Sequence, residues 1–430
     1  MSTAINRKIA PESKEVNNIL FVLAKTLVLK SGLNIHYINA GTDDVVRLDL
    51  VFDAGVNKQK QKGVAVATNM MLTEGTSNYS AKQIAEKLDY YGAYFQTRCT
   101  ADDSMITLYC LKKHFSTCVP FILDIISKSI FPEKELETYK NNSIQRLAVN
   151  ELRNSFLNRR VFYSSIFGEN NCYGTYSLSN DYEKISRETL LSYFNNNYKN
   201  GLKYILLAGG VDEVILKECE QLFSGISVSL MANDIFTELD YALPKSCFIE
   251  KQDSVQSAIR IGRKLFNRTH PDYGKLQMLN LILGGYFGSR LMRNIREEKG
   301  LTYGIHSSIE SYIGGGCFYI STEINNDLKE IGLLEIYKEI ADLKETVIPE
   351  GELMLAKNYM MGSFLRSFDG PFSIMDRYKA LVDYKLTYEY YDNFIENIKN
   401  ITSNNLIEVA NKYLQNEDLI EVVVGKNNAV

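Results

Sequence analysis

The sequence predicts an α+β fold made of two similar units in tandem, each with helices packed on a largely antiparallel sheet. Three observations support this prediction: a motif that recurs 217 residues later (349 minus 132), strand-like runs of alternating polarity, and long helical stretches segregated from those runs. We place the first unit at residues 1–224, a linker at 225–245 and the second unit at 246–430.

The repeat is clearest in two segments that contain Pro-Glu. The chain reads FPEKELETYKNN from residue 131 and IPEGELMLAKNY from residue 348. Six of ten positions recur at the shift of 217: Pro132/Pro349, Glu133/Glu350, Glu135/Glu352, Leu136/Leu353, Lys140/Lys357 and Asn141/Asn358. Shifts of 208 to 215 relate three further pairs: Gly92/Gly300, Tyr198/Tyr413 and Gly210/Gly425. A tandem duplication of a roughly 200-residue unit explains this pattern.

Both units show the same order of expected elements. A strand comes first, followed by an apolar helix, a helix ending at Gly92 or Gly300, alternating strands, long helices around the Pro-Glu motif, and a closing helix and strand. The expected strand regions are 45–52, 94–111 and 204–208 in the first unit and 257–261, 303–322 and 419–424 in the second. The stretch 225–245 lacks clear periodicity and is therefore assigned as the linker.

Composition excludes several classes of partner. The net charge is −4 and the Lys and Arg residues are scattered, so we expect no nucleic-acid partner. No run of 18 apolar residues is present, so we expect no membrane span. The seven cysteines are odd in number and widely spaced, which favours free thiols over a disulfide framework or zinc ribbon.

The N-terminal region predicts a cytoplasmic protein. The apolar run 19–24 is too short for a signal peptide, and Glu12 and Glu15 precede it. A processed periplasmic or organellar form, cut from a longer precursor, would look the same.

The segment from Gly284 to Gly304 carries the first candidate site. Its sequence, GGYFGSRLMRNIREEKGLTYG, predicts a short helix with Ser289 as N-cap, a stop at Gly300 and then a strand. Arg296 lies in the last helical turn and Tyr303 early in the expected strand, so a reversal at the glycine would place both on one side. A guanidinium and a phenol there would suit a peptide carbonyl. The same spacing also fits an Arg that complements the helix dipole and a packed Tyr.

Other candidate sites are weak. No two of the four histidines lie close enough in sequence for a helical zinc motif: His36, His114, His270 and His306. Gly209-Gly210 follows an expected strand, but G-x-G-x-x-G is absent and Asp212 would repel phosphate, so a capped helical turn is the preferred interpretation. No residues support an independent hydrolase with unrelated chemistry.

With the duplication and these motifs in view, the chain resembles the pitrilysin/insulinase family of metallopeptidases, in particular two-domain subunits like those of mitochondrial processing peptidase. The family's first unit carries H-x-x-E-H in a stretch commonly of the form GVAHFLEHMLFKGT, and this chain reads GVAVATNMMLTEGT from residue 63. Val66 and Met70 stand at the two His positions, and Asn69 stands at the catalytic Glu position. The stretch is expected to be an apolar core helix ended by Gly75.

The family's third zinc ligand is also replaced. By resemblance, this downstream Glu would fall near Gln145 or Arg146. Val offers no donor atom, Met offers only a thioether suited to soft metals, and Asn cannot act as a general base at neutral pH. We therefore expect no catalytic residue, metal ligand or cofactor in this chain.

The second unit matches the family better. SRLMRNIREEKGLTY, from Ser289 to Tyr303, closely resembles the family segment whose Arg and Tyr help to hold substrate at the zinc of the other unit. The resemblance assigns substrate binding to Arg296 and Tyr303. Two such units are expected to form a clam-like half that encloses a chamber with a second half.

The resemblance implies a non-catalytic subunit of a heterodimeric zinc endopeptidase. Its partner would be a zinc-bearing subunit of the same family, and a peptide would be the substrate. The alternative is an inert scaffold like the core proteins of the respiratory chain. We also expect that peptide can add as a strand along an exposed first-unit edge at 97–101.

The degenerate motif makes a prediction about zinc. Chelator-free protein should hold no stoichiometric zinc at the helix around Val66, because Val66, Asn69 and Met70 provide no zinc-ligand set. Elemental analysis of the purified chain measures this. A full equivalent of zinc that disappears on mutation near Val66 would contradict the assignment.

Overall fold

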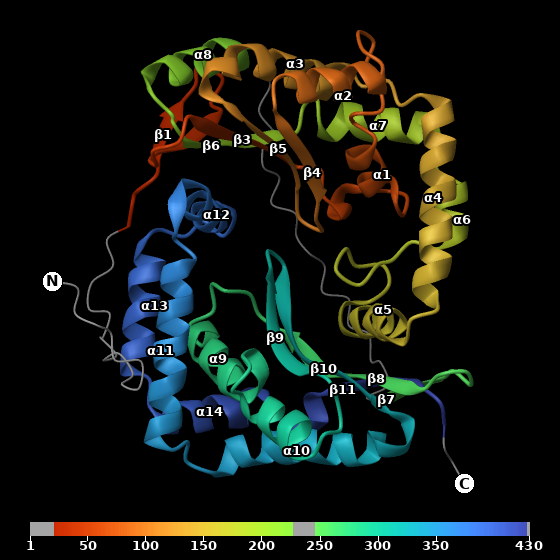
Figure 1. Cartoon of the computed structure of the whole chain (residues 1–430), viewed down its shortest axis with the longest axis vertical. Helices are drawn as coiled ribbons and strands as arrows, with labels where there is room; N and C mark the ends of the chain where they lie inside the picture. The colour runs from red at the N-terminus through yellow and green to blue at the C-terminus, as the bar shows by residue number, and fades with distance from the viewer. Residues whose placement is uncertain (1–20, 227–245, 428–430) are drawn as a thin grey trace, which may run out of the picture.

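The computed structural model describes residues 21–226 and 246–427, so all but two residues of the predicted linker lie outside the described part. The chain forms two halves, each a sheet with helices on its outer face (Figure 1). None of the helices in the described ranges is long and apolar enough to cross a membrane.

The two sheets share a five-stranded topology, and the first sheet has β1 as an additional edge strand. The strands of the first are β1 (Lys25–Val28), β2 (Asn34–Asn39), β3 (Val45–Phe52), β4 (Tyr94–Cys99), β5 (Ser104–Leu111) and β6 (Leu202–Gly209), in the order β1-β2-β6-β3-β5-β4. Those of the second are β7 (Ser246–Glu250), β8 (Gln256–Leu265), β9 (Ile305–Tyr312), β10 (Gly315–Asn325) and β11 (Ile420–Gly425), in the order β7-β11-β8-β10-β9. Only the β2/β6 and β7/β11 pairs are parallel among the described strands. The prediction of an α+β fold with largely antiparallel sheets is confirmed.

The helices also follow a repeated order. Those of the first half are α1 (Val64–Met70), α2 (Ala81–Tyr90), α3 (Phe115–Lys128), α4 (Glu133–Glu151), α5 (Asn154–Phe167), α6 (Ser179–Glu183), α7 (Arg187–Asn197) and α8 (Glu213–Phe223). Those of the second are α9 (Tyr273–Asn280), η3 (Leu281–Gly285), η4 (Met292–Glu298), α10 (Lys329–Glu345), α11 (Glu350–Arg366), α12 (Gly370–Asp383), α13 (Glu389–Asn400) and α14 (Ser403–Tyr413). Four short 3-10 turns complete the described elements: η1 (Val56–Lys58), η2 (Lys112–His114), η5 (Asn326–Leu328) and η6 (Asn416–Asp418).

The predicted repeat appears in matching elements. Pro132 is the N-cap of α4 and Pro349 is the N-cap of α11, so the Pro-Glu motif begins the same long helix in both halves. Gly92 follows α2 with φ +58° and Gly300 follows η4 with φ +64°, and in both places a left-handed residue lets the chain turn into the next strand. The duplication is thereby confirmed, whereas strands β1, β2 and β7 were not predicted.

Each half has its own core under the outer helices. In the first half, Phe52 and Leu48 of β3 are buried against helical residues that include Phe115 and Phe194. In the second, Ile259 and Ile261 of β8 pack in a separate cluster with residues of α9, α10 and α14. Burial of each such side chain contributes roughly 1.5–3 kcal/mol, so each sheet and its outer helices form a stable layer pair.

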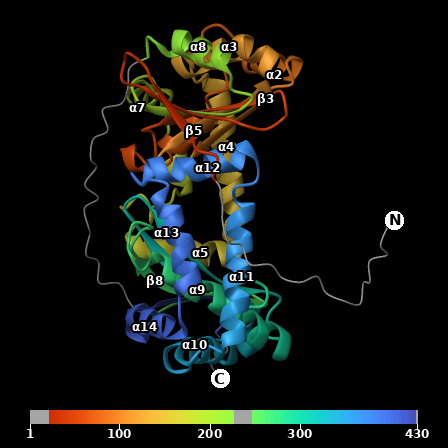
Figure 2. The same ribbon diagram turned by 90° about the vertical axis from the view of Figure 1, so that its left-hand side faces the viewer.

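The inner face of each sheet is covered by a helix from the other half. Helix α5 of the first half packs on β8 and β11, and α12 of the second half packs on β6 and β2. The long helices α4 and α11 run between the halves on opposite sides and carry the chain to these positions (Figures 1 and 2). This exchange was not predicted from the sequence.

Close packing and hydrogen bonds hold α5 against the second sheet. A Cβ at Gly262 would lie 2.8 Å from the ring of Phe162, so only glycine allows this ring to approach the strand. The amide of buried Asn158 donates to the carbonyl of Ala258 at 3.0 Å and to that of Val422 at 2.7 Å. One side chain thus joins α5 to two neighbouring strands.

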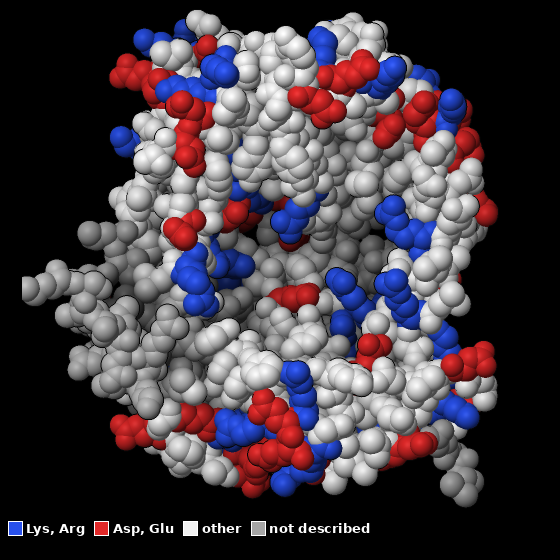
Figure 3. Space-filling view, in the orientation of Figure 1, with Lys and Arg blue, Asp and Glu red and all other residues white. Residues whose placement is uncertain are grey.

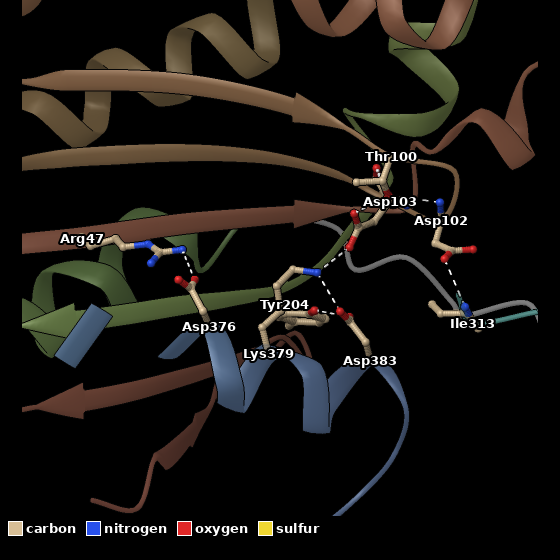
Figure 4. Close-up of polar contacts among 9 residues, drawn as sticks. All are labelled: Arg47, Thr100, Asp102, Asp103, Tyr204, Ile313, Asp376, Lys379 and Asp383. Carbon is tan, nitrogen blue, oxygen red and sulfur yellow. Dashed lines mark hydrogen bonds and ion pairs between the residues drawn. The ribbon is translucent and has the colours of Figure 1, made fainter. Parts of the chain in front are cut away.

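Ion pairs seat α12 on the first sheet (Figure 4). The Lys379 ammonium lies 2.6 Å from Asp103 and 2.7 Å from Asp383. The Asp383 carboxylate also accepts the Tyr204 hydroxyl at 2.5 Å. Burial opposes the charge on Lys379, but the two carboxylates outweigh burial and raise the pKa of Lys379.

A second ion-pair group ties α12 to the same sheet. Buried Arg47 contacts Asp49 at 2.9 Å and Asp376 at 2.6 Å, so it links a strand residue to the helix (Figure 4). Arg47 and Lys379 are therefore each paired with one carboxylate of the first half and one of α12.

We predict that Lys379→Met lowers the stability of the folded chain by about 3–5 kcal/mol, because it leaves the buried carboxylates of Asp103 and Asp383 without their cation. Denaturant and thermal unfolding midpoints measure the effect. The matched control is Lys82→Met on α2, an exposed lysine 3.7 Å from Glu86, which should change stability by less than about 0.5 kcal/mol. Equal losses for both variants would contradict the proposed role of Lys379.

Candidate substrate-binding segment

The segment 284–304 forms a helix against the second sheet, as predicted. Leu291 and Ile295 are fully buried, so both lie on the core-facing side of this helix. Ser289 does not cap the helix with its side chain. Its carbonyl accepts the N–H of Arg293 at 3.0 Å, but its buried hydroxyl has no hydrogen-bond partner among the described residues.

The helix is wider than expected. The N–H of Lys299 donates to the carbonyl of Asn294 at 3.0 Å, five residues back, as in a π-helix. The N–H of Leu301 then donates to Ile295 at 2.9 Å, and Gly300 between them turns the chain with its positive φ. Sequence periodicity cannot distinguish this turn from an α-helix, because both bury the same two apolar residues.

A polar network holds this helix on α10. The amide of Asn294 donates to Glu335 at 2.9 Å and to Glu339 at 2.7 Å, and the Lys299 ammonium lies 3.1 Å from Glu335. The hydrogen bonds from Asn294 and Lys299 lower the pKa of Glu335. The segment is therefore anchored by ionised groups.

A bidentate ion pair adds a second anchor, to α11. The Arg290 guanidinium donates two 2.9 Å hydrogen bonds to the carboxylate of Glu352. This fork geometry fixes orientation as well as distance, so the segment 284–304 is held on two helices.

Arg296 is the free cation of this segment. Its guanidinium lies 4.9 Å from the ring centroid of the exposed Phe287 and forms no ion pair or hydrogen bond with any described residue. Stacking on Phe287 orients the planar group while its N–H donors stay free. Phe287 was not singled out from the sequence, because a nine-residue spacing through a turn gives no periodic signal.

Tyr303 is almost fully exposed, with 92% of its surface accessible. It lies two residues before β9, which begins at Ile305, and not within the strand as predicted. The backbone beside it is fixed, because the Thr302 hydroxyl contacts the carbonyls of Glu323 at 2.8 Å and Gly304 at 3.0 Å. No contact joins Tyr303 to Arg296 in the described structure.

Helix α1 occupies the position of the degenerate zinc motif. Val66 and Met70 are 39% and 49% exposed, whereas Asn69 is 1% exposed. The Asn69 amide donates to the hydroxyl of buried Tyr198 at 3.0 Å. The expected core helix is thus wrong in two respects: two of the three replaced positions face outward, and the helix ends at Met70 and not at Gly75.

The third expected zinc position offers no ligand nearby. Gln145 and Arg146 are both exposed on α4. Within residues 21–226 and 246–427, no three His, Cys, Asp or Glu side chains are grouped so that they could hold a metal ion. The replaced residues do not fit a zinc ion.

The predicted strand edge is present. Strand β4 lies at the edge of the first sheet in the described structure, with alternating half-buried and exposed side chains. It ends at Cys99, and the carbonyls of Thr100 and Ala101 accept the N–H groups of Val56 and Asn57 at 3.0 Å. Only the part before Thr100 is therefore strand, which shortens the predicted range 97–101.

Comparison with known proteins gives family matches along most of the chain. Residues 34–170 match the family described as insulinase (peptidase family M16), and residues 184–360 match the peptidase M16 inactive domain. The crystal structure of a peptidase M16 inactive domain from Pseudomonas fluorescens has a TM-score of 0.82 and 23% identity, covering 94% of this chain and 99% of that chain. This likeness shows the fold.

Curated relatives carry different names. An uncharacterized zinc protease of Rickettsia felis is 27% identical, covering 93% of this chain and 97% of the relative. A Helicobacter pylori protein named non-peptidase homolog YmxG is 22% identical over 74% of each chain. The mitochondrial-processing peptidase subunit beta of Saccharomyces cerevisiae is 22% identical, covering 94% of this chain and 92% of the relative.

We predict that Asn69→Glu lowers stability by at least about 1–3 kcal/mol, because it removes the amide that pairs with the buried Tyr198 hydroxyl and puts a carboxylate there. The double variant Val66→His, Met70→His is the control. It changes two outward-facing side chains, so stability should change by less than about 0.5 kcal/mol. Thermal unfolding of the three proteins measures both. Wild-type stability of Asn69→Glu would show that this site does not depend on the amide.

Proposed function

This chain belongs to peptidase family M16, and on that premise we propose that it is the non-catalytic subunit of a heterodimeric zinc endopeptidase. The family model that matches residues 184–360 is described as an inactive domain, and one relative is named a non-peptidase homolog, which support a non-catalytic M16-like protein. Val66, Asn69 and Met70 replace the motif residues, so the zinc belongs to the partner.

In this proposal Arg296 and Tyr303 bind the peptide that the partner cleaves. Arg296 offers free N–H donors and a fixed charge, and Tyr303 offers a neutral hydroxyl. Both groups would donate to the carbonyl oxygen of the scissile bond, where negative charge develops during the reaction. A hydrogen-bond donor that is already in position before the reaction begins needs little rearrangement. The contacts of Arg290 with Glu352 and of Asn294 with Glu335 hold the segment 284–304 in position.

One observation carries this proposal. Arg296 keeps free donors and Tyr303 is almost fully exposed, although the segment around them is fixed by hydrogen bonds to α10, α11 and β10. A residue kept only for packing would bury its ring or pair its charge. The name of the yeast relative, a processing peptidase subunit, supports a partner of the same family.

An inert scaffold is the second candidate. The lack of contact between Arg296 and Tyr303 favours it, because a pair that acts on one carbonyl has to meet at one oxygen. In this alternative the two side chains are remnants, and the fold alone is used. The two candidates differ in whether a partner's activity depends on these two side chains.

We predict that Arg296→Lys and Tyr303→Phe leave folding and association intact but lower the peptidase activity of the mixture with a zinc-bearing partner. A point ammonium cannot reproduce the planar fork, and Phe lacks the donor. Loss of one such donor costs about 10²–10³ in kcat in other enzymes, with a smaller effect on KM.

The assay needs unaltered partner in excess, so that weakened association is not mistaken for weakened chemistry. The matched control is Arg293→Lys, an exposed arginine on the same helix whose guanidinium contacts the Gly288 carbonyl at 3.3 Å. The subunit proposal fails if both variants support wild-type turnover, or if no zinc-bearing partner's activity depends on this chain.

A further inference from the structure

A pocket of about 280 Å³ lies beside α5, between the two sheets. Helix α5 and the loop after it supply most of its wall, and β9 of the other half supplies the rest (Figure 1). Aromatic and basic side chains dominate the lining: Phe156, Arg159, Arg160, Tyr163, Tyr176 and Tyr312. The space-filling view shows the hollow between the halves, with charged side chains along it (Figure 3).

Two arginines line the pocket, and acidic groups approach it from behind the lining: Glu169 lies beside Tyr176, and Asp102 accepts the Tyr173 hydroxyl at 2.6 Å. No Asp or Glu is among the described residues that line it. Arg160 is paired with Glu151 at 2.7 Å and stacks on Tyr176 at 4.6 Å, so its charge is already compensated. Arg159 is exposed, lies 5.6 Å from the ring of Tyr163 and forms no ion pair or hydrogen bond with any described residue.

A second guanidinium without a salt bridge to any described residue lies behind the Tyr163 wall, and its Nη2 donates to the Ser321 hydroxyl at 3.3 Å. Arg260 of β8 is only 8% exposed, and its Nε and Nη1 atoms have no hydrogen-bond partner among the described residues. It stacks on Tyr319 at 4.6 Å and lies 5.8 Å from Tyr163. An unpaired buried guanidinium is costly, so an anion near it is favoured.

The nearby carboxylate of Glu310 does not form a salt bridge with either guanidinium. Its oxygens accept the hydroxyls of Tyr163 at 2.7 Å, Tyr319 at 3.4 Å and Tyr312. Burial and the hydrogen bond to Glu310 raise the pKa of Tyr163, so this hydroxyl remains a donor to Glu310. The carboxylate is thereby satisfied by phenols, and Arg159 keeps its donors without an acidic partner among the described residues.

We propose that this pocket binds a carboxylate of a peptide. Arg159 binds the carboxylate, and the aromatic side chains of the lining pack against the adjoining side chain of the peptide. A pocket of this size accepts one residue with its carboxylate, and a guanidinium can bind a carboxylate through two hydrogen bonds. A peptide provides both the charge and the apolar group. This inference rests on the proposed function, because it names a further contact for the same substrate class.

Calorimetric titration of the full chain with three synthetic peptides tests the proposal. The first is an acetylated alanine peptide that ends in phenylalanine with a free carboxylate, the second is its C-terminal amide, and the third is an amide with glutamate before the phenylalanine. The free acid should bind about ten-fold more tightly than the plain amide, since a charge-assisted hydrogen bond is lost on amidation. Tight binding of the third peptide as well would assign the site to side-chain carboxylates too.

Arg159→Gln should remove the preference for the acid. Arg153→Gln is the matched control, because Arg153 is an exposed arginine just before α5 that does not line the pocket. Equal affinities of all three peptides, or a preference that survives Arg159→Gln, would overturn the proposal. Neither result affects the role of Arg296 and Tyr303, which is measured by turnover with the partner.

Discussion

The structure depends on the mutual covering of the two sheets by α5 and α12. Each sheet has one face under its own helices, and its other face would meet water unless a further element covered it. Since each half supplies the helix that covers the other, separation of the two halves would expose the inner faces of both sheets to water. Asn158 and Lys379 satisfy the polar groups that this exchange buries. The exchange therefore fixes how the two halves sit together, and with them the sites between the halves.

The residues that stand at the family's zinc-motif positions in α1 are compatible with an intact fold because the helix has a buried and an exposed face. Asn69 stands at the Glu position. It faces inward and donates a hydrogen bond to Tyr198, so this side chain is part of the core. Val66 and Met70 face outward, where a change of side chain costs little. The two positions that correspond to His thus lie on a face that contributes little to stability, whereas the position that corresponds to Glu is part of the core.

The two proposed peptide contacts lie on parts of the chain that the fold holds rigid. Arg296 and Tyr303 project from a segment tied to α10, α11 and β10, and Arg159 projects from the helix that covers the second sheet. Both sites offer a guanidinium that lies near an aromatic ring and forms no ion pair with a described residue. A non-catalytic subunit needs such donors, because binding and orientation are all it can add to a partner's chemistry.

The sequence by itself determined the α+β class, the duplication, the Pro-Glu helices and the glycine turns at Gly92 and Gly300, because each depends on local pattern or on its recurrence. Through the family resemblance it also predicted that Val66, Asn69 and Met70 stand at the zinc-motif positions. The tertiary structure decided that α5 and α12 cross over, that η4 is a π-helix and that Tyr303 precedes its strand. It alone brought Arg159 close to Arg260, because residues a hundred positions apart meet only through the packing of α5 on β8.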